Sequence, residues 1–210
     1  MARFNLNKGE RFKLDKDSGL NLIQVDLGWK SGADLDASAF LLGEDGVIMD
    51  DADFVFYNSE NRNKPFNKSE FGNKKNWKGQ TCPMSKDGSV TGSIDDLGNG
   101  DEEEDEDAGE TMHVDLSKVN PKITEIVFIV TIYHGDEEGT TFGKVREPFI
   151  SITNEETGDE LCRFDLKDKF SSETAVVAGS LICDENGDWS FEAQGKGYEG
   201  GMQTLIDIYA

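Results

Sequence analysis

Short segments in which apolar residues alternate with polar ones, or run together, recur along this chain. They are rich in β-branched and aromatic residues, and turn-forming glycine, asparagine or aspartate bounds them. In the last of them, Trp189, Phe191 and Ala193 alternate with polar residues, as in a strand with one buried face. The pattern predicts strands over residues 54–58, 126–133, 148–154, 160–166, 175–183 and 189–195.

Hairpin turns and one helix complete the predicted architecture. Gly158 in "NEETGDE" and Gly187 in "DENGDW" lie between strands, where glycine readily adopts the positive φ of a tight turn. Near the C-terminus, Met202, Leu205 and Ile206 follow the three- and four-residue spacing of an amphipathic helix. We therefore expect a mainly β protein: a β-sandwich of two antiparallel sheets with a short C-terminal helix.

Composition and charge restrict the partners of this fold. The 210 residues, 36% of them hydrophobic, suffice for a sizeable core. The 21 basic and 43 acidic residues give a net charge of -22, which repels nucleic-acid phosphates and anionic membranes. No segment approaches the roughly 20 apolar residues of a membrane helix, and no apolar signal region opens the chain. We expect one cytoplasmic domain over residues 1–210, without nucleic-acid binding or membrane insertion.

The three cysteines of the chain predict neither disulfides nor zinc. Cys82, Cys162 and Cys183 are an odd number, and no C-x-x-C spacing occurs. We expect reduced thiols, with Cys162 and Cys183 buried as small apolar side chains.

Two segments depart from the rhythm of strands. Residues 94–110 form an acidic loop in which seven successive carboxylates run from Asp101 to Asp107. Residues 59–86 are a basic insertion, with seven lysines and arginines against two glutamates. Basic residues interleaved with aromatic ones suggest nucleic-acid binding in other proteins. The negative charge of the whole chain favours instead a surface loop that docks partly onto the acidic run.

An acidic run in isolation is more typical of a solvated loop than of a metal site. The segment "DLDASAFLL" adds a second group of oxygen atoms, because Asp34, Asp36 and Ser38 share one face of an extended strand. Two interpretations stay open: an amphipathic edge strand whose polar face meets water, or one half of a cation site. Calcium, which accepts about six to eight hard oxygen ligands in flexible geometry, fits these side chains better than magnesium or zinc.

Several strings, in order along nearly the whole chain, resemble the TerD family of tellurium-resistance and stress proteins. They are "VDLGWKSGADLDASAFLL", "DADFVFYN", "HVDLSKV", "IVFIVTIY", "TFGKV", "NEETGDELCRFDL" and "GKGYEGG". The resemblance implies a cytoplasmic β-sandwich that binds calcium between a D-L-D-A-S segment and an acidic loop rich in glycine, aspartate and asparagine.

Asp34 and Asp36 match the first of these family segments directly. Asp95 and Asp96 stand where the loop motif has aspartate and asparagine, whereas Ile94 replaces its glycine. The acidic segment that follows is expanded relative to the family, and the basic insertion also departs from it. Glu110 keeps its place before the next strand. The candidate metal ligands are Asp34, Asp36, Asp95, Asp96, Asp101, Asp107 and Glu110.

Together, residues and resemblance predict a calcium-binding protein of the tellurite or general chemical-stress response. It would act as a sensor, buffer or assembly component without catalysing a reaction, with calcium ions and other stress-response proteins as partners. One alternative is an interaction protein that recruits a basic partner through its acidic loop without metal. Another is a metal-assisted hydrolase. The hydrolase is disfavoured because no nucleophile motif accompanies His113 in its strand-like segment or His134 in its predicted turn.

Overall fold

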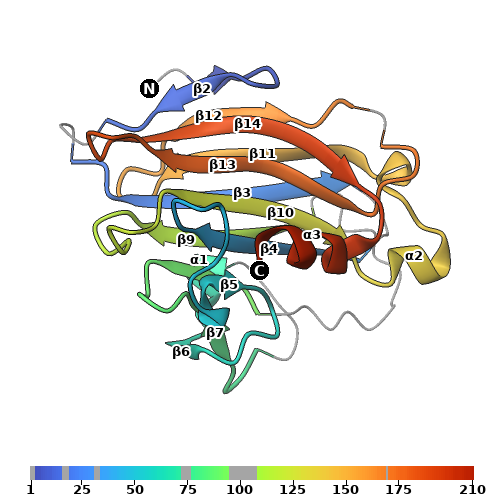
Figure 1. Ribbon diagram of the computed structural model, residues 1–210, viewed down its shortest axis with the longest axis horizontal. Helices are drawn as coiled ribbons and strands as arrows, with labels where there is room; N and C mark the ends of the chain where they lie inside the picture. Colours follow the sequence, from blue (N-terminus) through green and yellow to red (C-terminus); the bar gives the residue numbers. More distant parts are fainter. Residues whose placement is uncertain (1–2, 16–18, 31–33, 72–76, 95–107, 169) are drawn as a thin grey trace.

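The computed structural model describes residues 3–15, 19–30, 34–71, 77–94, 108–168 and 170–210. Most of its strands form two six-stranded sheets packed face to face (Figure 1). In order, sheet A contains β1 (Phe4–Asn5), β12 (Glu160–Asp165), β11 (Arg146–Asn154), β3 (Leu22–Lys30), β9 (Ala108–Asp115) and β8 (Val90–Gly92). Sheet B contains β2 (Arg11–Lys13), β14 (Trp189–Tyr198), β13 (Ala175–Cys183), β10 (Glu125–Ile132), β4 (Leu35–Leu42) and β5 (Phe54–Val55).

The pairing within the two sheets is antiparallel except between β1 and β12. Three short α-helices are described: α1 (Lys68–Phe71), α2 (Gly135–Glu138) and α3 (Gly201–Tyr209). The prediction of a mainly β sandwich with a short C-terminal helix is confirmed.

The main core lies between the two sheets, and a smaller one lies outside sheet B. β10 contributes to both, because Phe128 belongs to the inner core whereas Val127 and Ile129 belong to the outer one. α3 covers the outer face and buries Leu205 there. The uninterrupted apolar run of β10 therefore reflects a strand that is covered on both faces.

Most predicted segments coincide with observed elements. β13 has the predicted bounds, and β10, β11, β12 and β14 match their predicted ranges to within a few residues. Gly158 (φ 73°) and Gly187 (φ 77°) adopt the positive φ expected of the hairpin turns. Within the described ranges, no helix is long and apolar enough to cross a membrane.

The predicted strand over residues 54–58 is shorter in the structure. Only Phe54–Val55 pairs with β4. The chain then turns, because the Ser59 hydroxyl donates to the Phe54 carbonyl (3.0 Å) and accepts from the Phe56 N–H (3.0 Å). This local bonding replaces the strand-to-strand bonds that a longer β5 would make.

The basic insertion, residues 59–86, has more internal structure than the predicted surface loop. β6 (Arg62–Pro65) and β7 (Thr81–Pro83) pair as a separate two-stranded sheet that accompanies α1. The Arg62 guanidinium donates to the carbonyls of Tyr57 (2.6 Å) and Thr81 (2.8 Å), so this charge holds the insertion together. A small core encloses Phe66, Phe71, Cys82 and Ile94, with Trp77 packed against it.

This insertion docks on the outer side of sheet A at β9. The Phe71 ring meets the His113 ring edge-on with centroids 4.7 Å apart, and His113 Nε2 lies 3.1 Å from the Glu70 carbonyl oxygen. The predicted contact between the insertion and the acidic run falls on residues 95–107, which lie outside the described residues.

Candidate functional site

The predicted ligands on β4 lie at an edge where the two sheets approach each other. β10 pairs with β4 along its whole length, whereas β5 covers the opposite edge only at Ala39 and Phe40. Beyond the end of β5, a side chain replaces the backbone acceptor that a neighbouring strand would offer: Glu110 Oε2 accepts the Ala37 N–H at 3.0 Å. Glu110 belongs to β9 of sheet A, so this bond joins the two sheets beside Asp36.

Side chains of β4 alternate between the inner core and the outer face of sheet B. Leu35, Ala37, Ala39 and Leu41 belong to the core between the sheets. The strand alternation therefore directs Asp36 and Ser38 outward, on the face that carries Phe40 and Leu42.

The polar face of β4 is buried. Asp36 is 6% exposed and Ser38 is 0% exposed. The interpretation of a water-facing polar strand is therefore wrong for these residues. Asp34 precedes the strand and is exposed, with its carbonyl oxygen accepting the Tyr133 N–H at 2.9 Å.

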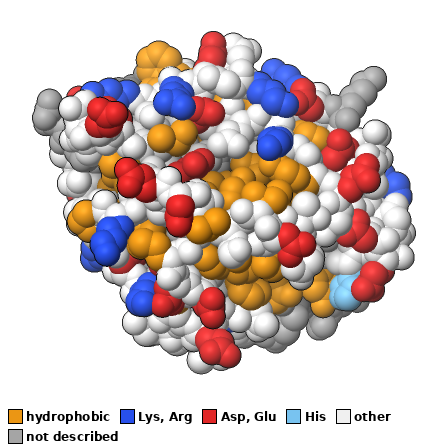
Figure 2. Space-filling view, viewed as in Figure 1, with side chains coloured by type: hydrophobic (Ala, Val, Ile, Leu, Met, Phe, Trp, Pro, Cys, Tyr) orange, Lys and Arg blue, Asp and Glu red, His pale blue; other side chains and the backbone are white. Residues whose placement is uncertain are grey.

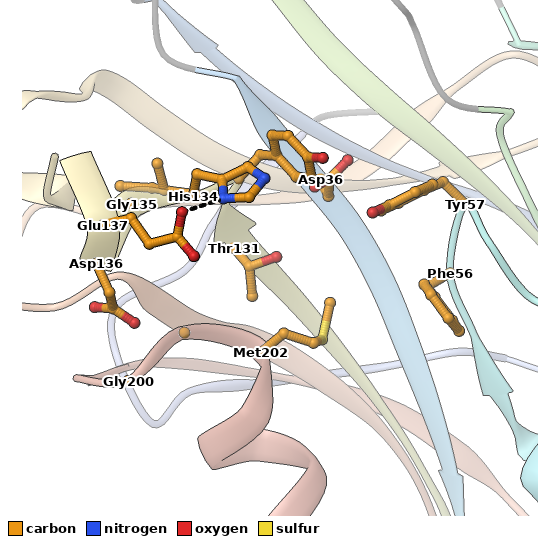
Figure 3. Close-up of a pocket in the computed structure, with 13 residues that line it drawn as sticks. Asp36, Phe56, Tyr57, Thr131, His134, Gly135, Asp136, Glu137, Gly200 and Met202 are labelled. Carbon is orange, nitrogen blue, oxygen red and sulfur yellow. Dashed lines mark hydrogen bonds and ion pairs between the residues drawn. The ribbon is translucent and has the colours of Figure 1, made fainter.

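Asp36 faces a hollow of about 300 Å³ on this outer face (Figure 3). Asp36 and Thr131 reach it from the neighbouring strands β4 and β10, while Phe56 and Tyr57 form one side. His134 and the acidic residues of α2 form the opposite side, and Met202 of α3 closes the lower end in this view. The hollow thus combines carboxylates with aromatic walls.

The walls of this hollow are tied together by hydrogen bonds. The Thr174 hydroxyl donates to Asp136 Oδ1 (2.8 Å) and accepts the Gly201 N–H (2.9 Å), which links α2 to the first turn of α3. Glycine is required at position 135, because a Cβ there would lie 2.9 Å from Ile132 Cβ. His134, at the start of α2 as its predicted turn position suggests, lies with Nδ1 2.8 Å from Glu137 Oε2.

Three of the predicted ligands fall in the described part of the chain. Asp36 lies in β4, and Asp34 directly precedes this strand. Glu110 is 8% exposed, and its Oε2 accepts the N–H of Ala37, the residue after Asp36. Asp95, Asp96, Asp101 and Asp107 lie outside the described residues. Within the described ranges, no three His, Cys, Asp or Glu side chains are gathered so that they could hold a metal ion.

The chemistry of the donors that are described suits a hard cation. They are carboxylate oxygens and the buried Ser38 Oγ, which has no hydrogen-bond partner among the described atoms. Calcium favours oxygen ligands of this kind. The donors fit calcium in type.

The described thiols have the environment of structural cysteines. Cys82 and Cys162 are buried, whereas Cys183, the last residue of β13, is only partly buried. The expectation of a buried Cys183 is therefore wrong, and the insertion encloses Cys82 instead. Burial raises the pKa of Cys82 to about 11 and that of Cys162 to about 12, so both thiols stay protonated and weakly nucleophilic at neutral pH.

Sequence reasoning missed most residues that surround Asp36. Thr131, Tyr133 and Thr174 belong to segments predicted only as strands and loops. A partial signal was present in the alternation of Phe54 and Phe56, which places both rings on one side of the chain.

Comparison with known proteins agrees with this architecture. The TerD domain family matches residues 1–209. General stress protein 16U of Bacillus subtilis (strain 168) is 37% identical over 98% of this chain and 96% of its own. The tellurium resistance protein TerD of Serratia marcescens is 33% identical over the same shares.

A solved structure shows the same fold. It is the crystal structure of a homologue of telluride resistance protein (TerD) from Streptomyces coelicolor A3(2), with a TM-score of 0.57 and 19% identity. The match covers 89% of this chain and 95% of that chain. The family match over residues 1–209 and the relatives that align over nearly their whole length agree with the shared fold. The chain therefore belongs to the TerD family.

Proposed function

We propose that this protein binds calcium and acts in the cytoplasm, in the response to tellurite or other chemical stress, as a binding module that does not catalyse a reaction. The names of its relatives, a general stress protein and tellurium resistance proteins, support the biological setting. Calcium would be held by Asp34, Asp36 and Glu110 together with Asp95, Asp96, Asp101 and Asp107.

The observation that carries this proposal is that buried carboxylates from two different sheets occur at one edge of β4. Asp36 and Glu110 are 6% and 8% exposed, and Glu110 bonds to the backbone N–H of Ala37, the residue after Asp36. Carboxylate oxygens are the ligands that calcium prefers, in shells of about six to eight oxygens.

The position of the acidic segment supports the same assignment. Residue 107 directly precedes Ala108, where β9 begins two residues before Glu110. Asp107 is thus only three residues from Glu110 along the chain. Calcium would join β4 of sheet B to this segment and to β9 of sheet A.

Exchanging single ligand carboxylates for amides should weaken calcium binding strongly. We expect Asp36→Asn and Asp95→Asn each to raise the Kd for calcium at least tenfold, because each removes a charged ligand from a shell of about six to eight oxygens. Titration calorimetry with calcium chloride on the metal-free protein measures this. Glu156→Gln, an exposed carboxylate in the turn between β11 and β12, is the matched control.

The control variant should bind calcium as the unchanged protein does. Unchanged affinity in both Asp36→Asn and Asp95→Asn would show that the assignment of these ligands is wrong. Metal analysis of the protein as purified separates the calcium module from an interaction protein that works without metal.

Much of the acidic run should contribute to binding only through its charge. Replacing Glu102, Glu103 and Glu104 together by glutamine is expected to raise the calcium Kd about two- to fivefold at low salt. The effect should shrink at high salt, because screening weakens long-range attraction but leaves direct coordination intact. The same titration, repeated at two salt concentrations, tests this. A complete loss of binding would place the ligands within residues 102–104.

A further inference from the structure

A groove follows one side of α3 on the outer face of sheet B. Met202, Ile206 and Ala210 recur every four residues and therefore form one stripe. Met202 lines the hollow beside Asp36, whereas Ile206 and Ala210 line a larger hollow of about 940 Å³. Phe56 borders both hollows, so together they form what we call the α3 groove. At about 1.5 Å per residue, its helical side is roughly 12 Å long.

Stacked aromatic rings build the wall opposite α3. The rings of Phe40 and Phe54 lie 4.3 Å apart at an interplanar angle of 5°, and those of Phe54 and Phe56 lie 4.5 Å apart at 13°. Phe40 is fully buried in the outer core, which anchors the stack. The groove therefore has one aromatic wall whose rings are held in place by stacking. Figure 2 shows hydrophobic side chains gathered on this face, over α3 and the strands beside it.

The rim of the α3 groove is negatively charged. Asp50, Asp51 and Glu60 border the larger hollow. Among the described residues that line it, Lys86 is the one Lys or Arg; it is paired with Asp50 and lowers the pKa of that carboxyl. The smaller hollow adds the carboxylates of α2, and no lysine or arginine lines it among the residues that the structure describes. An occupant of this groove must offer apolar side chains and positive charge together.

We propose that the α3 groove binds a basic amphipathic segment of a partner protein. Its apolar side chains would lie between Ile206 and the ring stack, and its lysines or arginines would face Asp51 and Glu60. The length and apolar floor match the recognition of an amphipathic peptide in a groove. This site goes beyond the proposed calcium function, because Ile206, Asp51 and Glu60 line the larger hollow, whereas Asp36 borders only the smaller one.

Charge selects this occupant over the alternatives. A second copy of this chain would bring another net charge of -22, and nucleic acid would bring phosphates, so both would be repelled. Complementary charge across an apolar contact speeds association and excludes wrong partners.

The test uses three labelled peptides of 14 residues and fluorescence anisotropy. The first places leucines on one face of a helix and lysines on the other; the second has glutamate for every lysine, and the third has glutamine for every leucine. We expect only the first to bind at physiological salt, with equal affinity in calcium and in chelator. The peptide assay is run both with calcium and with chelator. Its outcome therefore does not depend on whether the protein binds calcium.

Matched variants locate the binding on the groove. Ile206→Gln should weaken it at least tenfold, whereas Ile208→Gln, the same change at a 42% exposed position on the same helix, should alter it less than twofold. Asp51→Asn with Glu60→Gln should weaken it about three- to tenfold. Glu156→Gln with Glu185→Gln, the same loss of charge in exposed turns elsewhere, should have less than a twofold effect.

Thermal melts of the four variants verify that each remains folded. Equal losses within either matched pair, similar binding of all three peptides, or no binding of the first peptide up to about 1 mM would overturn the proposal. Self-association in sedimentation experiments that Ile206→Gln abolishes would do the same, because it would assign the groove to a second copy.

Discussion

Replacing Phe128 with alanine is expected to lower the free energy of unfolding by about 3 to 5 kcal/mol. Phe128 is 0% exposed in the core between the sheets and lies on β10, between β4 and β13. Its direct neighbours across the two strands are Ala39 and Gly179. Because both are small, neither side chain can fill the space that the ring would leave.

Thermal and urea unfolding measure this loss of stability. For a protein of this length, about 3 to 5 kcal/mol corresponds to a fall in Tm of roughly 6 to 20 °C. Phe4→Ala is the matched control, because the Phe4 side chain is 57% exposed and its ring centroid lies 5.4 Å from that of Phe12. We expect it to cost about 1 kcal/mol or less. Equal losses in the two variants would mean that the core is not centred between the sheets as described.

Saturating calcium is expected to raise the melting temperature of the metal-free protein by about 5 to 10 °C. A ligand that binds only the native state at a hundredfold excess over its Kd contributes about 2.7 kcal/mol. In a protein of this size, that free energy corresponds to the stated shift. The shift would arise because the ion relieves repulsion among buried carboxylates at the edge where Asp36 and Glu110 lie.

Melts in calcium chloride, in chelator and in sodium chloride of matched ionic strength separate coordination from screening. Sodium chloride should give a much smaller shift, because screening reduces repulsion without supplying ligand bonds. Amide exchange adds a local readout: the Ala37 N–H, bonded to Glu110, and residues 94–110 should exchange more slowly in calcium. Equal shifts in both salts with unaltered exchange would identify the acidic loop as solvated charge alone.

Local pattern was sufficient for many of the elements. Residues 175–183 became β13 with the same bounds, and the helical spacing of Met202 and Ile206 became α3. β3 lies outside the predicted strands, although its buried Ile23, Val25 and Leu27 alternate with less buried residues in the same way. The alternation of apolar and polar residues in this segment is itself typical of a strand with one buried face.

The candidate site was predictable only in part, for a different reason. Alternation along 34–42 determines that Asp36 and Ser38 share a face, but it does not determine what that face meets. The prediction for Asp95, Asp96, Asp101 and Asp107 concerns residues outside the described ranges, and it stays a prediction.

The sequence by itself therefore determined most of the long strands of sheet B, the strands β11 and β12 of sheet A, the hairpin turns, the C-terminal helix and the side of β4 that carries oxygen atoms. Tertiary structure decided that this side is buried, and it brought Phe56 and Met202 from distant segments to the hollow that Asp36 borders. It also brought Glu110 to Ala37, 73 residues earlier in the chain, and set the acidic rim of the α3 groove beside its apolar floor. Periodicity reports only how a chain orients its own side chains, whereas contacts between distant segments depend on how the two sheets pack.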